Sequence, residues 1–482
     1  MRHRSIGWFA VVWAPFVVWW LAEYPGEMWV DSFTAWREVT VGPWTNHHPA
    51  PFVAVVWLTT LGGHSVATAT LAQSVAVAAA LTYLALTLSR CWSAGRAPLL
   101  AAAAMGWLPL VAPFALILQK DAWELAAVLV VAAQIVRLAS ARDRTSGRTA
   151  WVGLFAAALS AALMRWNGAA TDIVTAVVVL LALTRGVRSR AFVTLTVAGL
   201  AGLAVLLAIP HVFDVRPVAP VDSNFQTLAD LGNYAADRPS LFTAADRAVL
   251  GRLAPFSEWQ RQGGTGCDTV NYIVFRLLGA PARKAAVGPN MHDLSALWRR
   301  LVRRDPATLA RLRICRAALA WSPVSLNGRP VLTLVPQISP NRYGITAHPV
   351  LLGAVARSWA DVSARNRVVQ AVAWRPAVWV VLAGALLLVR RPRWARSKRA
   401  AVATALAVPL GVLASYAVAP AAQDARYGYP ATLVCQLFIV AAIAAWRREG
   451  QSGVDTPAGV PDIAGSTISK YDGNGARPAS RR

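Results

Sequence analysis

The chain has 482 residues, of which 56% are hydrophobic and only 15% are charged, and its mean hydropathy is +0.44. About a quarter of the residues in a soluble domain are charged, so this composition excludes an ordinary soluble protein and predicts a membrane protein with several spans. The formal net charge of +25 does not indicate a nucleic-acid partner. The arginines are spread over loops between apolar segments, as expected for short cytoplasmic loops.

Apolar segments close to the ~20 residues that cross a bilayer follow one another along much of the chain. The first comes after Arg2 and Arg4 and ends without a small-residue cleavage pattern, so we expect a retained helix and not a signal peptide. The predicted spans are residues 6–22, 67–89, 98–118, 122–138, 150–165, 168–184, 191–210, 372–390, 400–420 and 430–446. Every short loop that this assignment places inside is basic, which predicts about ten helices with both termini in the cytoplasm.

Residues 51–62 form an apolar segment that is too short to cross a bilayer. Counting it as a span would also place every later arginine cluster outside. We therefore expect an interfacial helix over residues 51–61 on the outer surface, with a short crossing helix as the alternative.

Residues 211–371 are the one large block without a predicted span. Turn residues and mixed polarity predict that the block is folded, on the extracytoplasmic side. Cys267 and Cys315 both fall in it, where a disulfide is chemically allowed, although the sequence does not show that they meet. The tail is rich in Gly, Ser, Pro and Asp and is expected to be disordered.

The predicted fold is thus an all-α polytopic transmembrane bundle with a large extracytoplasmic mixed domain. Its parts are an N-terminal transmembrane module over 1–210 with a first outer loop over 23–66, the extracytoplasmic domain over 211–371, C-terminal transmembrane helices over 372–446, and a cytoplasmic tail over 447–482.

Polar residues gather in four loops that this topology places on the outer face. Ionisable groups at the ends of membrane helices are costly to desolvate and are usually functional, so four charged loops predict one site at the outer interface. The candidate residues are Glu27, Asp31, His47 and His48 in the first loop, Lys120 and Asp121 in the second, Arg165 and Asn167 in the third, and Asp424, Arg426 and Tyr427 in the last.

Each cluster also has a structural interpretation. The basic side chains could reach the interface and pair with a local acid, and His47 and His48 could fix a turn with Pro49 by hydrogen bonding. Glu27 and Asp31 differ, because residues four apart can share a helical face. Like charges so placed raise a carboxyl pKa, which suits a general base.

The first loop resembles that of the C-type (GT-C) superfamily of integral membrane glycosyltransferases. Within this superfamily, the protein O-mannosyltransferase and aminoarabinose transferase branch is the nearest comparison. The likeness rests on an acid in the first outer loop, on the turn His48-Pro49-Ala50-Pro51 before the apolar "FVAVVWLTTLGGHS", and on "RYGYP" before the last helix. It covers about residues 1–210 and, more weakly, 372–446. In many relatives a second acid follows the first, whereas here Ser32 follows Asp31.

The resemblance implies a plasma-membrane enzyme with an extracytoplasmic active site. Such enzymes transfer a sugar from a polyprenyl-phosphate donor to an envelope glycan, lipid or protein acceptor. Asp31, or Glu27 in its place, would deprotonate or orient the acceptor hydroxyl. Lys120, Arg165 and Arg426 suit the leaving phosphate, and a divalent cation at Asp31 would be compatible with this chemistry.

Two other functions account for part of the pattern. A transporter or flippase of lipid-linked or anionic solutes would also line a cavity with charges, but the charges here fall at helix ends and no inverted repeat is evident. A non-catalytic membrane scaffold would explain the basic outer block and leave the acidic first loop without a role.

Overall fold

The structure, a computed structural model, describes residues 2–108, 111–140, 148–183, 185–324, 338, 340–350, 352–388, 396–418 and 424–452. Within these residues the chain is helical, and extended pairing is limited to three isolated bridges. Among the described residues, five helices are long and apolar enough to cross a membrane, which confirms the prediction of an all-α helical membrane protein. They are α1 (Arg2–Ala22), α4 (Val66–Cys91), α7 (Lys120–Ser140), α10 (Arg185–Val212) and α22 (Tyr429–Ser452).

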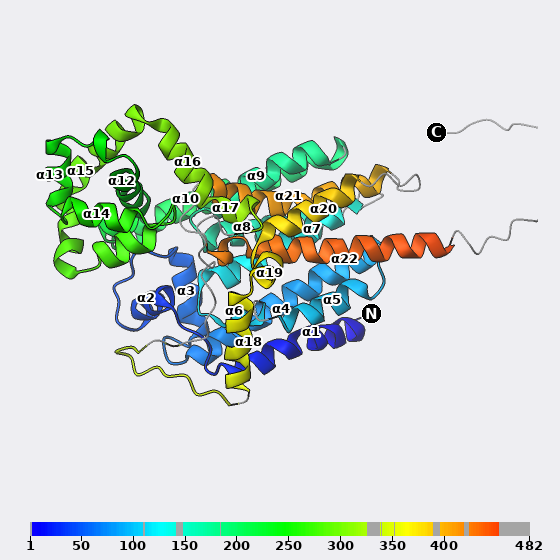
Figure 1. Ribbon diagram of the computed structural model, residues 1–482. Coiled ribbons are helices and arrows are strands. Elements are labelled where there is room, and N and C mark those ends of the chain that lie inside the picture. Colours follow the sequence, from blue (N-terminus) through cyan, green and yellow to red (C-terminus); the bar gives the residue numbers. More distant parts are fainter. Residues whose placement is uncertain are drawn as a thin grey trace, which may run out of the picture.

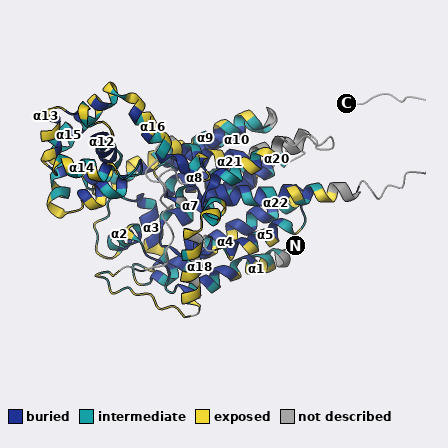
Figure 2. Cartoon of the chain, in the orientation of Figure 1, coloured by how far each residue is buried: buried dark blue, intermediate teal, exposed yellow. Residues whose placement is uncertain are grey.

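Further helices complete the bundle around these five (Figure 1). Helix α7 packs on α4, α8 and α21, and α9 packs between α10 and α21. Figure 2 shows that buried residues concentrate where these helices meet. The further members are α5 (Ala97–Gly106), α6 (Ala112–Leu116), α8 (Arg148–Met164), α9 (Gly168–Ala182), α20 (Pro376–Leu388) and α21 (Arg396–Val418).

Two of the predicted spans are not continuous. The segment predicted as 98–118 is split, because α5 ends at Gly106 and the short α6 begins at Ala112 with Pro113 in its first turn. A proline cannot continue the hydrogen bonding of a preceding helix. The segment predicted as 372–390 bends by 61° where a π-helical turn meets α20 at Pro376. Counting this bent pair as one span gives up to six membrane-length spans among the residues that the structure describes.

The start of α1 and the end of α22 lie at one end of the bundle (Figure 1). Helices α2 (Val30–Thr40) and α3 (Ala50–Thr59) lie at the opposite end, which we call the outer end after the predicted topology. Helix α3 spans ~15 Å, half of a bilayer core. It buries Phe52 and Val56 and exposes Trp57 and Leu58, as expected for an interfacial helix.

The outer block also lies at the outer end (Figure 1). A mixed domain was predicted, but the described part of residues 211–371 contains helices and no strand, and its core forms around Tyr234, Trp259 and Leu294. Cys267 and Cys315 form a disulfide with a Cα–Cα distance of 6.0 Å. The helices are α11 (Pro220–Ser223), α12 (Phe225–Asp237), α13 (Ala244–Gly251), α14 (Phe256–Gly263), α15 (Pro281–Arg304), α16 (Pro306–Arg316) and α17 (Ala318–Trp321).

Helix α18 (Gly353–Arg365) runs across the bundle and not along it (Figure 1). It contacts α1 and leads through α19 (Arg367–Val369) into the bend before α20. At the other end of the chain, α22 continues to Ser452, beyond the predicted limit at 446. Most of the tail predicted to be disordered, residues 453–482, lies outside the described residues.

Candidate functional site

Charged residues from all four predicted outer loops lie together at the outer end. Asp31 stands in the first turn of α2, Lys120 begins α7, Arg165 follows α8, and Arg426 precedes α22. These residues are far apart in sequence and are brought together by the packing of their helices. We call Asp31, His48, Lys120, Asp424, Arg426 and Tyr427 the outer cluster.

Asp31 is the carboxylate at the centre of the outer cluster. Its Oδ2 lies 2.7 Å from a terminal nitrogen of Arg426 and 3.8 Å from Nζ of Lys120, and its side chain is 26% exposed. Burial acts to raise the pKa of Asp31, but the charges of Arg426 and Lys120 outweigh burial and hold that pKa well below its usual range. Asp31 is therefore ionised at neutral pH and is reachable from solvent.

Ser32, the residue that follows Asp31, has a structural role. Its hydroxyl accepts a hydrogen bond from the backbone N–H of Trp29 at 2.9 Å, and its side chain is buried. This bond fixes the start of α2. An acid near a helix N-terminus is favoured by the helix dipole, so the same turn also stabilises Asp31 as an anion.

His48 connects two members of the outer cluster. Its Nε2 lies 3.0 Å from the backbone oxygen of Asp31, and its Nδ1 lies 3.3 Å from Nζ of Lys120. A carbonyl oxygen only accepts and an ammonium only donates, so Nε2 carries the proton and Nδ1 accepts. Burial holds the pKa of His48 well below its ordinary value, which keeps the ring neutral. His47 packs edge-on against His48, with ring centroids 4.7 Å apart.

Arg426 is held by two acids and an aromatic ring. Its Nε lies 2.8 Å from Asp424, while another nitrogen contacts Asp31. Tyr427 lies between two guanidinium groups, 5.2 Å from that of Arg426 and 4.7 Å from that of Arg165. The guanidinium group of Arg426 is thus oriented by Asp424 and Tyr427, and one of its terminal nitrogens contacts Asp31.

Arg165 lies deeper than the outer cluster. It contacts Asp121 at 3.1 Å and Glu124 at 2.8 Å, and all three side chains are buried. We call these three residues the buried triad. Because its guanidinium is committed to two carboxylates, Arg165 does not face a ligand as predicted. It fixes the first turn of α7, and with it Lys120.

Glu27 does not share a helical face with Asp31, so that prediction is wrong. Helix α2 begins only at Val30, and Glu27 is extended, with its backbone paired to Leu116 and Leu118. The chain enters this segment through Gly26 at φ +112°, where a Cβ would lie 2.4 Å from Thr70. The carboxyl group of Glu27 consequently lies next to Glu23 and away from Asp31.

Asn167 is the other candidate that stands apart. Its side-chain amide lies 3.5 Å from the hydroxyl of Ser415 on α21, at the start of α9. This contact joins two helices of the bundle and brings no group to Asp31.

Two residues that support the site were not predicted. Gln73 in α4 donates to the backbone oxygens of Ala115 and Ile117, which holds the strand-like segment before Lys120. Tyr416 in α21 stacks on Tyr427, with ring centroids 5.5 Å apart. A polar side chain inside an apolar span was the signal for both.

The site offers little to a metal. Among the residues that the structure describes, no three His, Cys, Asp or Glu side chains gather in a way that could hold one. Asp31 already faces two cations, which disfavours a third positive charge at the same carboxylate. The divalent cation considered for Asp31 therefore does not fit this geometry.

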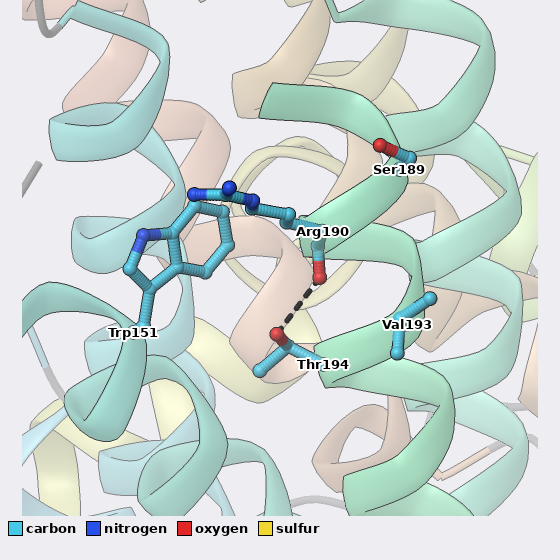
Figure 3. Close-up of a pocket in the computed structure, with 5 residues that line it drawn as sticks. All are labelled: Trp151, Ser189, Arg190, Val193 and Thr194. Atoms are coloured by element: carbon cyan, nitrogen blue, oxygen red, sulfur yellow. Dashed lines mark hydrogen bonds between the residues drawn. The ribbon is translucent and has the colours of Figure 1, made fainter. Parts of the chain in front are cut away.

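A hollow of about 360 Å³ lies at the other end of the bundle, between α8 and α10. Figure 3 shows Arg190 extended over Trp151, with Ser189, Val193 and Thr194 along α10. It contains one charged group and no acid, so the outer cluster remains the better candidate for chemistry. No family model, curated protein or solved structure matches this chain.

Proposed function

We propose that this protein transfers a sugar from a polyprenyl-phosphate donor to an acceptor on the extracytoplasmic face. The observation that carries the proposal is the partly exposed Asp31 carboxylate beside Lys120 and Arg426 at the outer end of the bundle. Sugar transfer needs one group for the acceptor proton and another for the phosphate charge, and this cluster supplies both.

In the proposed reaction the acceptor hydroxyl attacks the anomeric carbon while the bond from that carbon to the phosphate oxygen breaks. The bonding electron pair leaves with the lipid phosphate, and Asp31 takes the hydroxyl proton. A carboxylate of low pKa is a weak base, so Asp31 orients the hydroxyl first. It accepts the proton late, when the oxocarbenium-like transition state has made the hydroxyl acidic.

Lys120 and Arg426 bind the phosphate in this scheme. Their side chains are 18% and 17% exposed, whereas Arg165 is 7% exposed and held by two acids. When these cations turn to a phosphate they withdraw positive charge from Asp31, which raises its pKa toward that of a useful base. His48 acts as a positioning residue, because it orients Lys120 and holds the backbone of Asp31.

The surroundings suit a lipid-linked donor. The cluster lies where the spans end, so a polyprenyl chain could remain in the bilayer while its phosphate reaches Lys120 and Arg426. The acceptor would be an envelope glycan, lipid or protein, and the membrane would be the plasma membrane, as the resemblance implies.

The test is sugar release by the purified protein from a radiolabelled panel of polyprenyl-phosphate sugars. Wild type is compared with Asp31→Asn and with Asp361→Asn, which alters an exposed acid on α18. We expect turnover of at least one donor by wild type and Asp361→Asn, and turnover reduced by ~10²–10⁴ in Asp31→Asn. Failure of wild type to turn over any donor that it binds would contradict the proposal and favour a transporter or scaffold.

A further inference from the structure

Helix α18 and the residues just before it carry large apolar side chains on the surface of the described structure. On the helix, Val355 and Val362 are 62% and 56% exposed. They are seven residues apart, which places them on one face of the helix. Before the helix, Val350 and Leu352 are exposed as well. Exposed apolar side chains grouped in this way indicate a surface that binds a membrane or another protein.

The charged side chains of α18 lie on a different face. Arg357, Asp361 and Arg365 follow one another at intervals of four residues, so they share one side of the helix. This side is about 110° around the helix axis from the two valines, since a turn takes ~3.6 residues. Asp361 pairs with Arg365 at 2.7 Å, and both arginines are exposed. An apolar stripe flanked by arginines is typical of helices that lie in a membrane interface.

The start of α18 is held at the outer end of α1. The N–H of Val350 donates a hydrogen bond to the backbone oxygen of Leu21 at 2.9 Å. Gly353 allows a close approach, because a Cβ there would lie 3.0 Å from the backbone oxygen of Ala22. Ala22 is the last residue of the first membrane-length helix. The start of α18 therefore lies at the level where this span leaves the bilayer core.

The end of α18 is joined to the outer end of another span. Asn366 follows α18 and caps α19, where its side chain accepts hydrogen bonds from the N–H groups of Val368 and Val369. The segment Arg367–Trp374 and the first part of α20 form the bent pair that reaches membrane length together. The end of α18 therefore lies where a second span begins.

Helix α18 is thus fixed between the ends of two spans. It has 13 residues and a length of ~20 Å. Figure 1 shows that it crosses the direction of the spans. A helix that is fixed at the level of span ends and directed across the spans lies along the surface of the bilayer, where lipid is the material beside it.

We propose that α18 is an interfacial helix whose apolar side, with Val355 and Val362, inserts into the bilayer leaflet at the outer end. Helices of this kind place their apolar face ~5–10 Å into the boundary between headgroups and acyl chains. Arg365 and Arg367 then lie at the level of the lipid phosphates, which pair with guanidinium groups. A second copy of the chain is a poorer occupant, because a symmetric contact would bring the same arginines against one another.

Spin labels on single cysteines measure which side of α18 meets lipid. The full chain is reconstituted in nanodiscs of phosphatidylcholine and phosphatidylglycerol, with the free Cys91 and Cys435 replaced by alanine and the disulfide intact. Labels are placed at Val355→Cys and Val362→Cys on the apolar side, and at Ala354→Cys, an exposed position on the charged side. Collisions of each label with oxygen, which concentrates in lipid, and with a water-soluble nickel chelate are then measured.

Two further variants provide the reference values. Val152→Cys replaces an exposed valine on the membrane-facing surface of α8, and Ala248→Cys replaces an exposed alanine on α13 in the outer block. At Val355→Cys and Val362→Cys we expect nickel collisions about fivefold or more below those at Ala248→Cys, and oxygen collisions close to those at Val152→Cys. The label at Ala354→Cys should be reached by nickel as the label at Ala248→Cys is.

Two results would overturn the proposal. If nickel reaches the labels at Val355→Cys and Val362→Cys as readily as the label at Ala248→Cys, α18 lies in water. If both reagents are excluded from them, protein covers this side, and cross-linking between copies would identify a second chain. Thermal unfolding of each variant should match that of the parent without free cysteines, because the labelled side chains are exposed, so misfolding does not account for either result.

Discussion

Two aspartates in this protein are each held by two cationic side chains. In the outer block, Asp230 lies 2.7 Å from Arg313 and 2.7 Å from Arg316. At the outer end of the bundle, Asp31 lies 2.7 Å from Arg426 and 3.8 Å from Lys120. The same charge pattern therefore occurs twice, in two different surroundings.

The surroundings decide what each aspartate can do. Asp230 is fully buried, receives a further hydrogen bond from Trp298, and pairs with the fully buried Arg316, next to the disulfide-bonded Cys315. Asp31 is a quarter exposed and has one long contact, to Lys120. A fully buried carboxylate that is paired through both oxygens stabilises a fold, whereas a partly exposed carboxylate can still bind a ligand. This contrast is why we assign structure to Asp230 and chemistry to Asp31.

Replacing Asp31 should give the largest effect on activity. Asp31→Asn keeps the shape of the side chain and removes the base, so we expect turnover to fall by ~10²–10⁴. Stability should change by less than ~1 kcal/mol, because the ion pairs lost are partly exposed. Rates of sugar release and thermal unfolding of the same preparation check both statements. Equal turnover in the variant would remove Asp31 from the mechanism.

Replacing Asp230 should give the largest effect on stability. Asp230→Asn leaves the charge of Arg316 buried without its partner, which costs ~3–5 kcal/mol. Turnover per folded molecule should remain that of wild type. The measurement is denaturant unfolding in detergent beside active-site titration. If Asp230→Asn were as stable as wild type but did not turn over the donor, the structural role assigned to Asp230 would be contradicted.

Changing the arginine of each pair should sharpen the contrast further. Arg426→Lys replaces a fork that reaches Asp31 and Asp424 together with one ammonium, so turnover should fall by ~10². Arg313→Lys changes a side chain that is 24% exposed, so stability should fall by no more than ~1 kcal/mol. Turnover and the free energy of unfolding, each measured for both variants, test these two expectations.

The dependence on pH should be the smallest effect. The pKa of Asp31 is lower in the folded protein than in the unfolded chain. Its ionised form therefore stabilises the fold at pH values above the unfolded pKa of ~3.9, and this stabilisation is lost only as the pH falls through the folded pKa. The pKa of His48 is lowered as well. Turnover should therefore show no acid limb between about pH 6 and pH 8. An acid limb in that range that disappears in His48→Gln would contradict the neutral ring.

The sequence was sufficient to bring Asp31, His48, Lys120 and Arg426 into one hypothesis. Hydropathy and loop charge place their loops on one face of the bundle, at the ends of the spans. The burial of Arg165 could not be predicted from hydropathy and loop charge. Its burial depends on Asp121 and Glu124 meeting it through helix packing.

Local backbone geometry explains the other failures. Spacing suggested that Glu27 and Asp31 share a helix, but Gly26 introduces a positive φ and the helix starts three residues after Glu27. The break between α5 and α6 falls in a segment that is apolar throughout, so hydropathy could not reveal it. The two ion pairs of Asp230 inside the outer block join residues more than 80 positions apart.

The central claim is that Asp31 does chemistry while Lys120 and Arg426 bind phosphate, and donor affinity tests it most directly. Equilibrium binding of a polyprenyl-phosphate sugar should be measured for wild type, Asp31→Asn and Arg426→Gln. Removing the carboxylate frees both cations for the phosphate, so Asp31→Asn should bind the donor at least as tightly as wild type without turning it over. Arg426→Gln should bind it more weakly. Loss of donor binding in Asp31→Asn, or unchanged binding in Arg426→Gln, would contradict the account.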